Sequence, residues 1–161
     1  MTTVVYRDGV MASDSQYVEN DVIMPGHHPK VFRLPGGGIM GYCGLVEVAY
    51  QVLNLIKENK PLATLDEFNS ADTTILVVHE NGKISYTNGR EWTPIKVPYI
   101  AIGSGSPMAY GALALGASAR QAVKAAMKHD TTSGGRLQAI TMELDLWTGE
   151  RSYVSVEKEQ R

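Results

Sequence analysis

The start of the chain carries a residue type that can act as a nucleophile. Met1 precedes Thr2, and a methionine before a small residue is a substrate for methionine aminopeptidase, so Thr2 can become the first residue. A threonine hydroxyl is a weak nucleophile by itself, but an N-terminal α-amine with an ordinary pKa of about 8 can accept its proton. Many proteins begin with Met-Thr and have no such activity, so this pattern alone does not favour catalysis.

Two charged residues further along could serve such a nucleophile. A cation at Lys30, if close to Thr2, would favour the ionised oxygen and lower the pKa of the amine through like-charge repulsion. A carboxylate at Asp14 could orient that lysine. Taken alone, the two residues are more typical of solvated surface charges.

Glycine-rich segments supply the other groups that acyl transfer needs. Gly44 ends the segment GYCG at 41–44, where an expected strand enters a helix, and its N–H could stabilise an oxyanion. Ser104 lies in GSGSP at 103–107, and Asp130 and Ser133 lie in DTTSGG at 130–135. Small hydroxyl residues among glycines can hold an amine and a water. Taken separately, a simple turn and ordinary loops explain these segments better, and GSGSP has neither the lysine of a P-loop nor the spacing GxGxxG.

Short apolar runs between turn residues predict an antiparallel sheet structure that positions these groups. We expect strands at 3–6, 10–13, 30–34, 39–43, 73–79, 83–86, 99–102, 137–146 and 152–156. Asp8-Gly9 and Thr148-Gly149 are favoured hairpin turns. Alternate residues of a strand lie on one face, and along 137–146 one such set is mostly apolar, so that face is expected to be buried. The set is Gln138, Ile140, Met142, Leu144 and Leu146.

Helical spacing of apolar residues predicts the remaining elements. A helix is expected at 45–59, at most one helical turn at 64–68, a helix at about 108–115, and another from Ser118, a good N-cap, to about His129. Strands and helices in this order indicate a layered α+β domain, and we expect one domain over 1–161.

Composition narrows the class of protein. The chain has 161 residues, 43% hydrophobic and 20% charged, with a formal net charge of −2. It contains no basic run typical of nucleic-acid or membrane binding, no membrane span and no signal peptide at its start. A single cysteine, Cys43, excludes an intrachain disulfide and fits a reducing compartment. We therefore expect a cytoplasmic protein without a nucleic-acid or membrane partner.

Taken together and in order, the segments TTVV at 2–5, ASDS at 12–15, KVFRL at 30–34, GYCGLV at 41–46, GSGSPMAYG at 103–111 and DTTSGG at 130–135 resemble the proteasome β-subunit and HslV family of N-terminal-nucleophile hydrolases. The resemblance implies a four-layer αββα sandwich of antiparallel sheets. Its departures are a short chain and too few residues between Pro61 and Thr73 for the family's second long helix. A reduced bacterial or phage-type homologue fits these features.

The resemblance also implies roles for the matched residues. Thr2 would be the nucleophile, with Lys30 tuning pKa values, Asp14 holding Lys30 and Gly44 donating the oxyanion N–H. Ser104, Asp130 and Ser133 would position the amine. The pocket residues would be Tyr17, His28, Phe32, Tyr42 and Val46, which indicates an apolar or aromatic residue before the cleaved bond. No metal or organic cofactor is implied. The implied partners are a homo-oligomeric ring, an ATP-dependent unfoldase and unfolded polypeptide substrates.

Other functions stay open from the sequence. The main alternatives are a catalytically silent structural subunit of the same fold and a small-molecule amidase using the same N-terminal threonine chemistry. His27 and His28 lack the supporting ligands of a metal site. Cys43 is more typical of a small buried hydrophobe than of a nucleophile.

Overall fold

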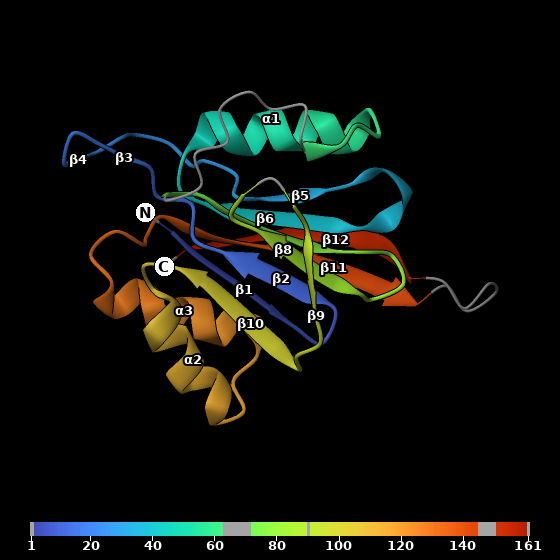
Figure 1. Cartoon of the computed structure of the whole chain (residues 1–161). Coiled ribbons are helices and arrows are strands. Elements are labelled where there is room, and N and C mark those ends of the chain that lie inside the picture. The colour runs from blue at the N-terminus through green and yellow to red at the C-terminus, as the bar shows by residue number, and fades with distance from the viewer. Residues whose placement is uncertain (1, 63–71, 90, 145–150, 161) are drawn as a thin grey trace.

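The structure, a computed structural model, describes residues 2–62, 72–89, 91–144 and 151–160 (Figure 1). The helical turn expected at 64–68 and the turn at Thr148-Gly149 lie outside these residues. The expectation that no second long helix separates Pro61 from Thr73 also falls on undescribed positions.

The first five-stranded sheet is antiparallel and has the order β10-β1-β2-β11-β12. Its strands are β1 (Thr3–Arg7), β2 (Val10–Ser13), β10 (Tyr99–Gly103), β11 (Arg136–Leu144) and β12 (Arg151–Gln160). Asp8 and Gly9 join β1 to β2 with positive φ angles of 50° and 78°. Aspartate and glycine tolerate that backbone, so the predicted hairpin turn is confirmed.

The second five-stranded sheet is also antiparallel, with the order β5-β6-β7-β8-β9. Its strands are β5 (Val31–Arg33), β6 (Ile39–Cys43), β7 (Thr74–Val78), β8 (Ile84–Thr87) and β9 (Thr93–Ile95), and a short 3-10 helix, η1 (Pro35–Gly37), joins the first two. The strand β9 was not predicted because it contains Pro94. Proline cannot donate to a strand ladder, but an edge strand such as β9 tolerates it.

A separate hairpin of β3 (Val18–Glu19) and β4 (Val22–Ile23) was also not predicted. Its turn residues Asn20 and Asp21 have positive φ angles of 50° and 63°. Both residue types adopt that conformation more readily than most others, so the turn signal was present in the sequence. The hairpin projects from the end of the sheets (Figure 1).

Among the described residues, three α-helices cover the outer faces of the sheets: α1 (Val46–Lys57), α2 (Ser106–Ala114) and α3 (Ala119–His129). The helix α2 begins two residues earlier than expected, because Pro107 occupies the first turn, where its missing N–H costs no hydrogen bond. Ser118 caps α3 as predicted. Its hydroxyl accepts from the N–H of Gln121, whose side chain accepts from the N–H of Ser118.

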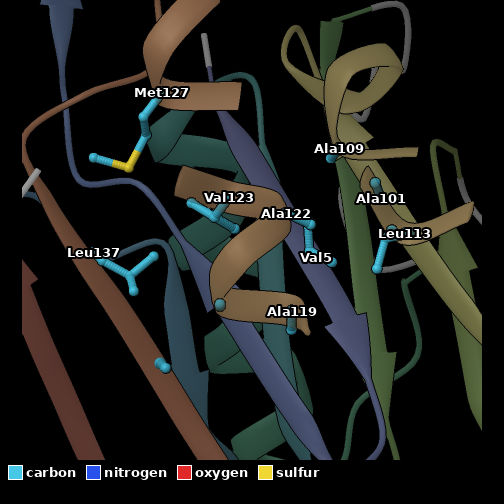
Figure 2. Packing of buried hydrophobic residues seen from close by; sticks show 11 residues of the cluster. Val5, Ala101, Ala109, Leu113, Ala119, Ala122, Val123, Met127 and Leu137 are labelled. Atoms are coloured by element: carbon cyan, nitrogen blue, oxygen red, sulfur yellow. The ribbon is translucent and has the colours of Figure 1, made fainter. Parts of the chain in front are cut away.

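Three apolar clusters define the layers. One lies between α1 and the second sheet, including Val52, Leu53 and Ile75. Another lies between the two sheets, including Val4, Leu76 and Ile140. The third packs α2 and α3 on the first sheet and includes the labelled residues of Figure 2. The order is therefore helix, sheet, sheet, helix (Figure 1), and the predicted α+β class with antiparallel sheets is confirmed.

The strand β11 differs from its expected exposure pattern. Gln138, Ile140 and Met142 are buried as predicted, but Leu137 and Ala139 on the opposite face are buried too. The first sheet lies between the second sheet and the helices α2 and α3, so both of its faces are covered. Within the part of the chain that the structure describes, no helix has the length and apolar character needed to cross a membrane.

Candidate active site

The register of β1 separates the two threonines at the start of the chain. Alternate residues of a strand point to opposite faces. Val4 packs between the two sheets, whereas Val5 packs under α3. Thr2 shares the parity of Val4 and lines a cavity. Thr3 lies on the same face of the strand as Val5, so its hydroxyl points toward the layer of α2 and α3. Of the two threonines, Thr2 therefore lines the cavity and Thr3 does not.

The cavity beside Thr2 has a volume of about 320 Å³. Its lining residues come from the starts of β1, β5 and β7, from the segment after β2 and from the passage of β6 into α1. They are Thr2, Gln16, Tyr17, Val18, Lys30, Tyr42, Gly44, Leu45, Val46 and Asp72. Most of the wall is apolar or aromatic. Chain segments far apart in the sequence thus converge around the hydroxyl of Thr2.

Three of the five predicted pocket residues, Tyr17, Tyr42 and Val46, line this cavity. His28 instead packs its ring on Tyr17, with centroids 4.8 Å apart. Phe32 stacks on Tyr42 at 6.1 Å and belongs to the cluster beneath α1. The structure therefore places His28 and Phe32 behind the lining residues Tyr17 and Tyr42 and does not bring them into the lining itself.

Lys30 reaches the cavity as one half of a buried ion pair. Its Nζ lies 3.1 Å and 3.0 Å from Oδ1 and Oδ2 of Asp14, and the two residues are 3% and 0% exposed. Burial lowers the pKa of Lys30, and the charge of Asp14 and its hydrogen bond offset only part of that effect. The site therefore holds a lysine that releases its proton more easily than an exposed one.

Asp14 is held by the backbone as well as by Lys30. Its carboxylate accepts the N–H groups of Thr3 at 3.0 Å, Gln16 at 3.2 Å and Gly134 at 3.0 Å. These three donors come from β1, from the segment after β2 and from the loop before β11. The carboxylate consequently joins three parts of the chain and fixes the position of Lys30 relative to β1.

Gly44 lies at the cavity wall in a conformation that requires glycine. Its φ is +108°, and a Cβ there would lie 1.8 Å from the carbonyl oxygen of Asp72. Leu45, the N-cap of α1, follows directly and donates its N–H to Thr73 Oγ1 at 3.0 Å. Gly44 thus stands beside the positive end of the α1 dipole, which suits an N–H that faces a developing negative charge.

The predicted residues Ser104, Asp130 and Ser133 form one hydrogen-bonded cluster. Asp130 Oδ2 accepts from Ser104 Oγ at 2.7 Å and from Ser133 Oγ at 2.5 Å. Burial acts to raise the pKa of Asp130, but the hydrogen bonds from Ser133, Ser104 and Thr132 outweigh it, and the net pKa is lowered. The cluster also lies close to the start of β1, since Ser104 Oγ is 3.4 Å from the carbonyl oxygen of Thr2.

The glycines of the GSGS segment explain how this cluster approaches β1. Gly103 has a φ of +97°, and a Cβ there would lie 1.8 Å from the carbonyl oxygen of Thr2. A Cβ on Gly105 would lie 1.9 Å from Thr3 Oγ1. Both positions therefore exclude side chains, and the loop packs directly on the first two threonines.

Two residues of the cluster were not predicted as part of the site. Thr3 Oγ1 lies 2.7 Å from Ser133 Oγ, and Thr132 Oγ1 lies 2.8 Å from Ser104 Oγ and 3.1 Å from Asp130 Oδ1. The signal for Thr3 was its place next to Thr2 on a strand, but its orientation becomes clear only from the strand register. Thr132 sits inside the DTTSGG segment next to Thr131, and the sequence alone does not show which of the two threonines faces Asp130.

Other candidate groups do not assemble a second centre. Burial raises the pKa of the Cys43 thiol, which opposes formation of the reactive thiolate. His27 Nδ1 lies 3.2 Å from Ser15 Oγ. Among the described residues, no three histidine, cysteine, aspartate or glutamate side chains gather where they could hold a metal ion.

A larger cavity of about 480 Å³ lies at the opposite end of β6, β7 and β8. It is bordered by Trp92 and by the turn after β7, with His79, Glu80 and Lys83. His79 Nε2 lies 3.2 Å from Ser85 Oγ. None of the candidate catalytic residues lines this cavity, so the smaller cavity at Thr2 is the candidate active site.

Among solved structures, the fold is similar to that of the protein BPH from Thiobacillus denitrificans. BPH in complex with epoxomicin matches with a TM-score of 0.64 and 22% sequence identity, over 89% of this chain and 98% of that chain. A second BPH structure matches with a TM-score of 0.65 and 21% identity, over 90% of this chain and 98% of that one. The two proteins share a fold at this level of identity. No protein-family model and no curated protein matches the chain.

Proposed function

We propose that the chain is a threonine endopeptidase of the N-terminal-nucleophile hydrolase class, with Thr2 as its nucleophile. The observation that carries this proposal is the convergence of Thr2, Lys30 and Gly44 on one apolar-walled cavity. A nucleophile, a cation held by a buried carboxylate and a candidate oxyanion donor are the groups that acyl transfer requires.

In the proposed reaction, the hydroxyl of Thr2 attacks the carbonyl carbon of a peptide bond, and the free α-amine of Thr2 accepts the proton. Lys30 lowers the pKa of both groups through its positive charge. The N–H of Gly44 stabilises the negative oxygen of the tetrahedral intermediate. The amine then protonates the leaving group, and a water hydrolyses the acyl-enzyme with the same amine as base.

The likeness to BPH supports the proposal from a different direction. One BPH structure is a complex with epoxomicin, a peptide epoxyketone that inhibits proteasomes. An epoxyketone can bridge a hydroxyl and a free amine on the same residue, and an N-terminal threonine offers that pair. Extending this chemistry to the present chain is part of our proposal.

Assembly into a ring forms the second part of the proposal. We propose a homo-oligomeric, proteasome-like ring that encloses the Thr2 sites, fed with unfolded polypeptide by an ATP-dependent unfoldase. Support comes from large apolar side chains that are exposed on and just after α2, at Met108, Tyr110 and Leu115. Exposed apolar side chains of this size can mark an interface when they are buried by a partner.

Intact mass after incubation with epoxomicin tests the proposed chemistry. We expect loss of Met1 and addition of one inhibitor mass, with no adduct in Thr2→Ala and none in Lys30→Ala. The variant Cys43→Ala is the matched control, and it should be labelled like the natural chain because the thiol takes no part. A processed chain without an adduct would contradict the peptidase and favour a silent subunit.

The products distinguish the peptidase from the amidase alternative. A peptidase should cut an unfolded protein into peptides, whereas a small-molecule amidase should leave it intact. Thr2→Ala removes the activity in either case, so the identity of the product carries the distinction.

The cavity lining predicts the residue before the cleaved bond. Tyr17, Tyr42 and Val46 present apolar and aromatic surface, so we expect apolar or aromatic residues to be favoured by about tenfold or more over charged ones. Fluorogenic peptides that differ only at this residue measure the preference through kcat/KM. Equal cleavage of acidic, basic and apolar peptides would rule it out.

A further inference from the structure

Thr3 connects the two charged clusters of the candidate site. Its N–H donates to Asp14 Oδ1 at 3.0 Å, on the side of the Lys30 ion pair. Its side-chain Oγ1 lies 2.7 Å from Ser133 Oγ, on the side of Asp130. One residue, adjacent to the proposed nucleophile, therefore contacts both clusters through different atoms.

Counting protons gives the direction of the hydrogen bonds in the Asp130 cluster. The pKa of Asp130 is lowered, so at neutral pH its carboxylate accepts hydrogen bonds and donates none. Ser133 has one hydroxyl proton and donates it to Asp130 Oδ2 at 2.5 Å. In the contact between Thr3 and Ser133, the donor must consequently be Thr3.

Packing keeps the hydroxyl of Thr3 in this place. Thr3 is 0% exposed, and its Oγ1 would lie only 1.9 Å from a Cβ on Gly105. The space around the hydroxyl is thus closed by the backbone of the 103–105 loop. Neither bulk water nor an alternative rotamer competes easily for the bond to Ser133.

We propose that Thr3 is a positioning residue, whose hydroxyl holds Ser133 as a donor toward Asp130, so that Ser133 can take the amine-positioning role that the proposed function gives it. This inference rests on the proposed function. A serine hydroxyl accepts as many as two hydrogen bonds, and the bond from Thr3 occupies one of those places. In this series of hydrogen bonds, Thr3 donates to Ser133 and Ser133 donates to Asp130. The hydroxyl oxygen of Ser133 therefore acts as an acceptor, which is the role that an N-terminal amine needs from its neighbour.

Two substitutions separate the hydroxyl of Thr3 from its shape. Thr3→Val keeps the branched side chain and removes the donor, whereas Thr3→Ser keeps the donor and removes the methyl group. The matched control is Thr87→Val, which deletes another buried hydroxyl, bonded to the carbonyl oxygen of Gly89 at 2.8 Å, at a residue outside the cavity lining and the Asp130 cluster.

Epoxomicin labelling followed by mass gives the rate constant of modification, kinact, and the apparent affinity, KI. For Thr3→Val we expect kinact to fall roughly tenfold, the equivalent of one hydrogen bond, with KI unchanged because Thr3 faces away from the cavity. Thr3→Ser should recover most of the rate, and Thr87→Val should match the natural chain. Simple misfolding would instead lower the fraction labelled. An unchanged kinact in Thr3→Val, or equal losses in Thr3→Val and Thr3→Ser, would overturn the proposal.

A second measurement does not depend on activity. Carbon-13 NMR titration of the Asp130 carboxyl should give a higher pKa in Thr3→Val than in the natural chain and in Thr3→Ser, because Ser133 becomes a weaker donor without Thr3. An unchanged pKa of Asp130 in Thr3→Val would contradict the inferred direction of the hydrogen bonds from Thr3 through Ser133 to Asp130. Failure of the natural chain to be labelled would count against the proposed function, and the titration would then decide the role of Thr3 alone.

Discussion

At the residue scale, the Asp14–Lys30 pair predicts unequal effects of removing its two members. Lys30→Met leaves Asp14 with its three backbone donors, and we expect it to lower the free energy of unfolding by about 3 kcal/mol. Asp14→Ala leaves a buried ammonium and three N–H groups without their acceptor, so its cost should be larger. Chemical denaturation at pH 7 measures both variants.

The control for that comparison is the exposed pair of Lys60 and Glu58, whose side chains are both 55% exposed and whose charged atoms lie 2.6 Å apart. Lys60→Met should change the free energy of unfolding by less than about 1 kcal/mol. Equal costs for Asp14→Ala and Lys30→Met would show that the backbone donors of Asp14 add nothing to stability.

The ionisation of Asp130 should make the free energy of unfolding depend on pH in the acid range. Its pKa is below the ordinary value of 3.8, so the folded state favours the ionised carboxylate. That contribution is present above pH 3.8 and is lost as the pH falls through the folded pKa. Asp130→Asn should therefore be less stable than the natural chain at pH 7, by about 1–3 kcal/mol, with the difference shrinking below pH 4. A difference that stays constant from pH 7 to pH 3 would argue against an ionised Asp130.

The residues of the candidate site could be predicted largely from their order along the chain. Asp14 and Lys30 meet, and Ser104, Asp130 and Ser133 meet, although each group is scattered in the sequence. Orientation was the part that could not be predicted. Whether His28 or Phe32 faces the cavity depends on packing between layers, and these contacts have no signature in the local sequence.

At the element scale, Gly41 predicts how closely the two sheets can approach. A Cβ there would lie 2.7 Å from Met11 Sδ and 2.7 Å from Val4 Cγ1, so Gly41→Ala would push β6 away from the first sheet. We expect a loss of about 1–3 kcal/mol in the free energy of unfolding. Gly111 in α2 has open space around it, and Gly111→Ala should instead gain about 0.5–1 kcal/mol. Thermal or chemical denaturation that gave both changes the same sign would contradict this account.

Most elements were predictable because hairpin turns and helix caps act over short distances. The turn at Asp8-Gly9 and the capping box of Ser118 and Gln121 are both confirmed. The β3–β4 hairpin escaped prediction although Asn20 and Asp21 carried a local turn signal, whereas two other features depend on their neighbours. The strand β9 forms although it contains Pro94 because it lies at the edge of its sheet, and the second face of β11 is buried because another layer covers it.

At the scale of the whole molecule, the exposed apolar side chains of the α2 region predict self-association. Leu115 is 92% exposed and Tyr110 is 40% exposed, and burying such side chains against a second copy of the chain would be favourable. We expect sedimentation velocity to show an oligomer, and we expect the double substitution Tyr110→Glu and Leu115→Glu to shift it to smaller species. Lys83→Glu at the distant turn after β7 is the control. An unaltered assembly in the double variant would exclude this surface as the interface.

The position of β1 within its sheet has a consequence for synthesis. It is synthesised before both of its neighbours in the sheet, β2 and β10, and Thr3 pairs with Gly103 and contacts Ser133. These partners are translated much later, so the surroundings of Thr2 cannot assemble while the earlier part of the chain is being made. A truncated translation product that ends before Asp130 would carry the threonine without its site. The proposed peptidase would thus stay inactive until synthesis has passed Ser133.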